Sequence, residues 1–237
     1  MQIANTGERI LLEKETPIFI ARHFCAYKFA KGYAQGMDVL DIACGEGYGS
    51  YFLADFALMV TGIDYDPEVI GYAKEKYKRD NLEFLTLDIN ALGSLKKKFN
   101  LICSFQFIEH LKDAKAFLTS IKGNLSESGI FICSTPNKYD ASPNSDAPLN
   151  KFHLKEYTLL EFRELLEAGF KEVRIWGLKR TRRQRFYRRL KKIGLFNFLP
   201  HSLNPVERFF ASAGCEDFAI IKDVLDSALD FIAVCRN

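Results

Sequence analysis

Short apolar runs alternate with stretches of helical spacing from about residue 37 to residue 177. The runs of strand length are Val39–Ile42, Leu58–Ile63, Leu82–Leu87, Leu101–Phe105, Gly129–Ser134 and Phe170–Trp176, and Leu229–Cys235 adds a seventh near the end of the chain. The helical stretches between them are Tyr48–Phe56, Pro67–Tyr77, Asp113–Leu125 and Thr158–Ala168, and Thr158 with Glu161 predicts a capping box at the start of the last one. This alternation predicts an α/β fold in which helices cover both faces of a doubly wound, mostly parallel sheet.

Residues 178–227 do not follow the alternation. They lie between the sixth and seventh predicted strands and contain Pro200 and Pro205. We therefore expect a single domain over 1–237, with an N-terminal helical cap over 1–36 and a mostly helical insertion or lid over 178–227. The apolar runs are too short for a transmembrane helix, and the first 30 residues lack the apolar run of a signal peptide. A cytoplasmic protein is expected.

Glycines and acids gather at the predicted strand ends. Gly45, Gly47 and Gly49 follow the first strand and open a helix, which lets the backbone approach a ligand closely. Acidic residues fall at or near the ends of three successive strands, at Asp41, Asp64 and Asp88. Because parallel sheets bind ligands beyond the carboxyl ends of their strands, the three carboxylates are expected to converge on one crevice.

Four segments together resemble the class I S-adenosylmethionine-dependent methyltransferases. They are Val39–Gly49, Gly62–Asp66, Leu87–Asn90 and Phe99–Leu111, with Asn100 where the family usually has aspartate. The resemblance covers roughly residues 37–177 and resumes at the C-terminal strand. It implies a Rossmann-like, seven-stranded sheet whose last strand is antiparallel, with the helical insertion between the sixth and seventh strands.

The resemblance also implies a set of cofactor contacts for S-adenosylmethionine. Asp64 would bind the ribose, Tyr65 would pack on the adenine, and Asp88 with Ile89 would contact the base. Asp41, Ala43 and Gly45 would line the methionine part of the cofactor. Gly47 and Phe105 complete the expected cofactor-binding set.

A dinucleotide-binding dehydrogenase is the main competitor for the glycine loop. Such folds need a G-x-G-x-x-G spacing and bind pyrophosphate at a helix N-terminus. Here the spacing is G-x-G-x-G, and Glu46 stands where it would repel a pyrophosphate. An acidic crevice suits a cationic sulfonium ligand, so the sequence favours the methyl donor.

Transfer of a methyl group to an alcohol requires removal of a proton, for which a general base is useful. His110 follows the fourth strand and faces the expected methyl position, so it is the first catalytic candidate; His153 is the second. For each, a purely structural role is the alternative. The few histidines have no clustered spacing, and no metal is expected.

The flanking motifs narrow the resemblance to glycan and O-antigen-associated methyltransferases of the type 11/type 23 group. They include Thr6–Arg9, Ser134–Asn137 and Asn150–Glu156. This implies O-methylation of a sugar, glycan or other small hydroxylated acceptor in polysaccharide biosynthesis, with Arg9, Glu109 and Asn137 as acceptor contacts. The central motifs also occur in quinone-biosynthesis O-methyltransferases, so a quinone-type acceptor stays open.

Nine basic residues lie between Lys179 and Lys192 with no acid among them. The rest of the chain carries 24 basic and 30 acidic residues, a net charge of −6. A helix over Arg180–Ile193 would place Phe186, Leu190 and Ile193 on one face. It could pack as a lid with a solvated basic back, lie on an anionic membrane surface at the inner membrane face, or grip RNA as a nucleic-acid methyltransferase. The acidic remainder of the chain disfavours nucleic acid.

Overall fold

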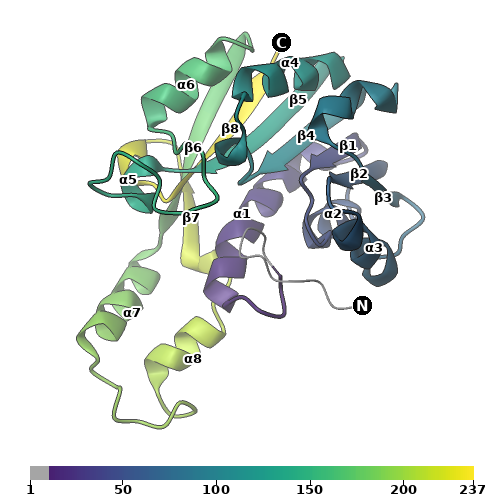
Figure 1. The fold of residues 1–237 in the computed structure, drawn as a ribbon. Helices are drawn as coiled ribbons and strands as arrows, with labels where there is room; N and C mark the ends of the chain where they lie inside the picture. Colours follow the sequence, from purple (N-terminus) through teal and green to yellow (C-terminus); the bar gives the residue numbers. More distant parts are fainter. Residues whose placement is uncertain (1–10) are drawn as a thin grey trace.

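The computed structural model describes residues 11–237 as an eight-stranded sheet with helices on both faces (Figure 1). The sheet order is β3-β2-β1-β4-β5-β8-β6-β7. The strands are β1 (Asp38–Ile42), β2 (Met59–Asp64), β3 (Leu82–Thr86), β4 (Phe99–Phe105), β5 (Leu125–Pro136), β6 (Glu172–Arg180), β7 (Phe218–Ile221) and β8 (Asp230–Arg236). This confirms the predicted α/β, Rossmann-like architecture.

The helices also follow the predicted alternation. They are α1 (Pro17–Ala34), α2 (Tyr48–Leu53), α3 (Pro67–Lys76), α4 (Ala114–Asn124), α5 (Lys138–Ala141), α6 (Leu159–Glu167), α7 (Arg182–Ile193) and α8 (Pro205–Ala211). Short 3₁₀ turns cover Ile89–Leu95, Ile108–His110, Cys215–Asp217 and Leu225–Ser227. The capping box predicted at α6 is present, because Thr158 and Glu161 exchange side-chain and backbone hydrogen bonds. No helix of the described residues is long and apolar enough to cross a membrane.

Two apolar layers hold the helices to the sheet. On one face, Phe117 of α4 and Phe162 of α6 pack with Ile42 and Phe131 of the sheet. On the other face, α1 and α2 pack against the sheet, with Ala30 and Leu53 fully buried. Strands β1 to β5 are parallel to one another. Strands β2 and β4 lie on opposite sides of β1, so the strand order reverses at β1. Such sheets bind ligands at the point where the order reverses.

The C-terminal part of the sheet differs in one strand from the sequence prediction. As expected, β8 is antiparallel, and it lies between β5 and β6. An additional strand, β7, pairs antiparallel with β6 at the sheet edge and comes from the segment expected to be a mostly helical insertion. Four residues are too few to show a period, so only pairing with β6 defines this strand.

Helices α7 and α8 form an arm that projects away from the sheet (Figure 1). The helix expected over Arg180–Ile193 is present, but its apolar face is not packed on the domain, because Phe186 and Ile193 are exposed. The packed face is a different one: Gln184 is buried, and Tyr187 stacks on Phe209 of α8 with ring centroids 4.2 Å apart.

Candidate active site

The loop between β1 and α2 bends through three left-handed residues. Ala43, Gly45 and Gly47 have φ values of 58°, 55° and 92°. A Cβ atom on Gly47 would come within 2.7 Å of the Phe84 ring, so both the backbone angle and the space require glycine here. The amide of Gly45 donates to the Asp64 carboxylate over 3.1 Å, which fixes the loop against the end of β2.

A cavity of about 310 Å³ opens beside this loop at the carboxyl ends of the central strands. The predicted site residues that line it are Ala43, Gly45, Asp64, Tyr65, Asp88, Ile89, Phe105 and His110. They come from four separate parts of the chain, and the fold brings them together around one volume. Gly47 shapes the loop without lining the cavity.

Asp41 lies beneath the cavity instead of lining it, although the sequence predicted a contact with the cofactor. Its side chain is fully buried and accepts hydrogen bonds from Ser50 Oγ (2.6 Å) and the Tyr27 hydroxyl (3.2 Å). Burial raises the pKa of Asp41 to about 7. Asp41 therefore joins β1 to α1 and α2. Its effect on a ligand would be indirect, through Ser50 and Tyr27.

The lining of the cavity is acidic. Glu46, Asp64 and Asp88 line it, and no lysine or arginine does so among the described residues. Glu46 is buried and pairs with Lys76 (3.3 Å), so it contributes less negative potential than its sequence position suggests. A cavity with this charge suits a cation better than a pyrophosphate, which requires positive groups or unpaired backbone amides.

Helix α1 forms a wall of the cavity that the sequence did not predict. His23 and Tyr27 line it, together with Tyr48, Asn90 and Gln106. Burial, with a smaller effect from the adjacent Arg22, lowers the pKa of His23 to about 3, so this imidazole is neutral. No local signal marks these α1 residues, because α1 reaches the cavity only through packing on the sheet.

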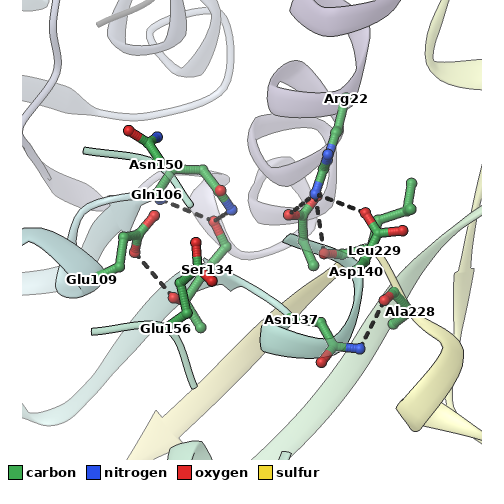
Figure 2. A network of polar contacts seen from close by, with 12 residues as sticks. Arg22, Gln106, Glu109, Ser134, Asn137, Asp140, Asn150, Glu156, Ala228 and Leu229 are labelled. Atoms are coloured by element: carbon green, nitrogen blue, oxygen red, sulfur yellow. Dashed lines mark hydrogen bonds and ion pairs between the residues drawn. The ribbon is translucent and has the colours of Figure 1, made fainter. Parts of the chain in front are cut away.

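Arg22 anchors α1 in this position (Figure 2). Its guanidinium donates two 2.7 Å hydrogen bonds to the Asp230 carboxylate and one of 3.0 Å to the Leu229 carbonyl. Bidentate pairing of this kind fixes orientation as well as adding energy. The first helix and the last strand are thereby joined across more than 200 residues.

His110 lies at the mouth of the cavity, directly after β4 and its short connecting loop. Its Nδ1 is 2.9 Å from the Phe152 carbonyl oxygen, which can only accept a hydrogen bond. This contact places the ring proton on Nδ1 and the basic lone pair on Nε2. The surroundings thus select the tautomer that a general base requires.

His153 packs edge-to-face on His110, with ring centroids 5.0 Å apart, but it does not line the cavity. Its Nδ1 is 2.8 Å from a carboxylate oxygen of the buried Glu156, and its Nε2 is 2.9 Å from the Asn150 amide nitrogen. Both ring nitrogens therefore have protein partners. The second catalytic candidate is placed to support His110 rather than to meet a substrate.

Glu109 is fully buried, and Figure 2 shows Glu156 beside it. It accepts a hydrogen bond from Thr135 Oγ1 (3.0 Å) and does not line the cavity. Burial raises its pKa to about 8. One ligand atom each from Glu109, His110 and His153 lie within 4.8 Å of one another, so these are the described residues that could hold a metal ion. Ligand atoms around zinc lie closer, about 3.4 Å apart.

The raised pKa of Glu109 predicts how stability depends on pH. The folded protein holds this proton to about pH 8, whereas the unfolded chain loses it near 4.5, so stability falls as pH rises between these values. We expect Glu109→Gln to make the fall in Tm between pH 5.5 and 8.5 roughly 10 °C smaller. Calorimetry at the two pH values measures this difference. Asp41 titrates in the same direction and leaves a residual slope.

The matched control for this prediction is Glu127→Gln, which changes an exposed glutamate of β5. It is expected to leave the dependence of Tm on pH as it is in the wild type. Equal slopes for wild type and Glu109→Gln would show that Glu109 ionises normally in the folded protein.

Asn137, also predicted from the sequence as an acceptor contact, does not line the cavity. Asn137 is fully buried, donates to the Asp226 and Ala228 carbonyls (both 2.9 Å), and accepts from the Tyr139 amide. It therefore joins the end of β5 to the chain before β8 and starts α5. Arg9 lies outside the described residues.

The comparison with protein families matches residues 34–181 to a methyltransferase domain. A probable S-adenosylmethionine-dependent methyltransferase of Mycolicibacterium smegmatis is 38% identical over 168 residues, which are 70% of this chain and 64% of that protein. This chain is a class I S-adenosylmethionine-dependent methyltransferase. The region matched by the Mycolicibacterium smegmatis protein covers less than two thirds of that protein's length.

The methyltransferase is also similar to a second curated protein and to a solved structure. A ubiquinone biosynthesis O-methyltransferase of Cereibacter sphaeroides is 31% identical over 106 residues, 44% of this chain and 43% of that protein. A solved S-adenosylmethionine-dependent methyltransferase of Archaeoglobus fulgidus shares the fold, with a TM-score of 0.61, 17% identity, and coverage of 92% of this chain and 93% of that one. The acidic cavity of the methyltransferase fits its cationic cofactor, S-adenosylmethionine.

Proposed function

We propose that this methyltransferase methylates a hydroxyl oxygen of a sugar or glycan, with His110 as the general base. The observation that carries the proposal is the position of His110: it lines the cofactor cavity, and the Phe152 carbonyl leaves its basic lone pair on Nε2. A hydroxyl is the acceptor that benefits most from such a base, because it gives up its proton only with help at neutral pH.

The proposed cofactor contacts follow the lining of the cavity. Asp64 ends β2, is mostly buried, and is held by the Gly45 and Asp66 amides, so its carboxylate is fixed for the ribose hydroxyls. Tyr65, Asp88 and Ile89 lie on the adenine side of this carboxylate in the proposed pose. The methionine part is assigned to Ala43 and Gly45.

The chemistry needs little beyond positioning and one proton transfer. When bound, S-adenosylmethionine would supply an activated methyl group: its C–S bond breaks as the C–O bond to the alcohol forms, S-adenosylhomocysteine is the leaving group, and the alcohol's proton has to be removed. Nε2 of His110 takes that proton, while the Nδ1–H bond to Phe152 keeps the ring in place. Phe105 and Tyr27 meet edge-to-face with ring centroids 4.8 Å apart and give the cavity an aromatic wall. Alignment of the reacting groups supplies much of the rate.

The class of acceptor is supported by a polar group close to His110 in the chain. Gln106 lines the cavity, and its amide, held by Ser134 Oγ (3.2 Å), is of a kind suited to sugar hydroxyls. Similar proteins include a ubiquinone biosynthesis O-methyltransferase and a malonyl-[acyl-carrier protein] O-methyltransferase. A quinone-type phenol is therefore the second candidate acceptor, favoured by the similarity to the ubiquinone enzyme.

Methyl transfer from labelled S-adenosylmethionine to a panel of acceptors tests the proposal. Sugar nucleotides and oligosaccharides are expected to accept label as base-stable methyl ethers, and ortho-dihydroxy phenols are expected to accept little. Label that appears only on the phenols would replace the glycan by the quinone-type acceptor. Label that is released by mild base would identify carboxylate methylation and contradict an ether product.

A further inference from the structure

The arm formed by α7 and α8 exposes a set of large apolar side chains. On α7, Phe186 and Ile193 are 56% and 69% exposed, and Leu190 lies between them at helical spacing. The connection to α8 adds three more, with Leu195, Phe198 and Leu203 at 49%, 79% and 63% exposure. Isolated exposed apolar residues are ordinary, but several large ones on one projecting element indicate an interaction surface.

Basic residues share the arm with these apolar side chains. Arg182, Arg185, Arg188, Arg189 and Lys192 are all exposed, and none forms an ion pair with another described residue. Internal pairing is limited to the other side of α7, where Arg183 lies 3.8 Å from Asp217 and Lys191 lies 3.3 Å from Glu207. The outward face therefore combines unneutralised positive charge with apolar side chains.

The arm leaves the sheet at the edge that carries the active site. Strand β6 is parallel to β5, since both pair antiparallel with β8, so β6 ends at the same edge as β4 and β5. Helix α7 begins directly after β6, and Arg180 at this junction pairs with Asp140 of α5 (3.2 Å). A surface bound by the arm would consequently lie on the side of the molecule where acceptors enter.

We propose that the arm binds the surface of a membrane that contains anionic lipids. Exposed apolar side chains and unpaired arginine and lysine on one arm match the acyl and the headgroup layers of such a surface. Binding by the arm is independent of the acceptor. Membrane binding by the arm would also bring the active site to a glycan acceptor on a lipid carrier. Only this connection to the acceptor rests on the proposed function.

Flotation with vesicles tests this proposal. The purified full chain is expected to float with phosphatidylcholine vesicles that contain phosphatidylglycerol, and not with phosphatidylcholine alone. Raised salt weakens the charge contribution because it screens exposed groups. A triple charge reversal, Arg182→Glu with Arg185→Glu and Arg189→Glu, is expected to lower the partition coefficient by about a hundredfold.

A second variant removes apolar side chains of the arm and keeps its basic residues. Phe186→Ser with Ile193→Ser and Phe198→Ser is expected to lower partitioning at least tenfold, since each substitution removes an apolar side chain that would be buried in the acyl layer. The matched control reverses three exposed lysines in and beside α4, Lys112→Glu with Lys115→Glu and Lys122→Glu, and is expected to keep more than half of the binding. A thermal shift with S-adenosylmethionine shows that each variant is folded.

Three results would overturn the proposal. They are equal flotation of the arm variants and the wild type, an equal loss in the α4 control, and flotation that does not require anionic lipid. The proposal also fails if polyuridylate binds tightly through the same arginines while vesicles do not bind, because the arm would then be a nucleic-acid surface. Turnover of a water-soluble acceptor is unchanged in all these variants if the proposed function holds, which separates the two proposals.

Discussion

Replacing His110 with alanine is expected to lower turnover by about 10²- to 10⁴-fold, the usual contribution of a positioned general base. This corresponds to about 3–5 kcal/mol in the activation free energy. The loss is expected in kcat and not in cofactor affinity, because the cavity keeps its acidic lining and its glycine loop. Steady-state kinetics with an identified acceptor, together with calorimetric titration of S-adenosylmethionine, separate the two quantities.

Partial rescue of His110→Ala by added imidazole is expected, since the deletion leaves room for a small base. The matched control is His201→Ala, which removes an exposed histidine of the arm and should leave turnover unchanged. His153→Ala is expected to cost about tenfold, because that ring supports His110 without lining the cavity. Wild-type turnover in His110→Ala would remove the base assignment.

Chelation provides an independent check on the same residues. The general-base mechanism predicts that turnover of the wild type continues in the presence of a chelator. Turnover that stops on chelation and returns with added zinc would instead assign Glu109, His110 and His153 to a metal site.

Asp64→Ala is expected to weaken binding of S-adenosylmethionine by about a hundredfold. In the proposed pose this carboxylate accepts hydrogen bonds from the ribose, and hydrogen bonds to charged groups contribute about 1.5–3 kcal/mol each. The substitution also removes the acceptor of the Gly45 amide, so the loop loses its tie to β2. Calorimetric titration and the cofactor-induced rise in Tm both measure the change.

Asp64→Asn is the conservative variant for this prediction, and Asp66→Ala is its matched control. The asparagine keeps one oxygen acceptor and is expected to lose about tenfold in affinity. Asp66 accepts from the Glu68 amide at the start of α3, so its alanine variant is expected to lose about 1 kcal/mol of stability and to bind the cofactor normally. Equal losses for Asp64→Ala and Asp66→Ala would mean that both act on the fold and not on the ribose.

Local pattern was sufficient for most of the secondary structure. Helix α6 was predicted from Thr158, Glu161 and its apolar spacing, and the capping box is formed as expected. By contrast, β7 was missed because its pairing with β6, and not its four residues, makes it a strand. The arm helix was predicted at the right position, while the direction of its apolar face depended on which side packs against α8.

The same division holds within the site. Gly45, Asp64, Asp88 and Phe105 follow strand ends, and parallel strands bring their ends to one edge, so the sequence placed them together. Asp41 matched the same pattern but lies beneath the loop, because Ser50 and Tyr27 occupy its carboxylate. The contribution of α1 to the cavity had no sequence signal, since no rule of spacing relates Tyr27 to strands that follow it.

The sequence by itself determined the alternating fold, the family and the nature of the cofactor, because these depend on periodicity and on residue types at strand ends. Only the tertiary structure decided which candidates reach the cavity, which histidine has the tautomer of a base, and that the apolar face of α7 is turned outward. Each of these depends on contacts between segments far apart in the chain. Such contacts are set by packing and burial, which a local pattern does not encode.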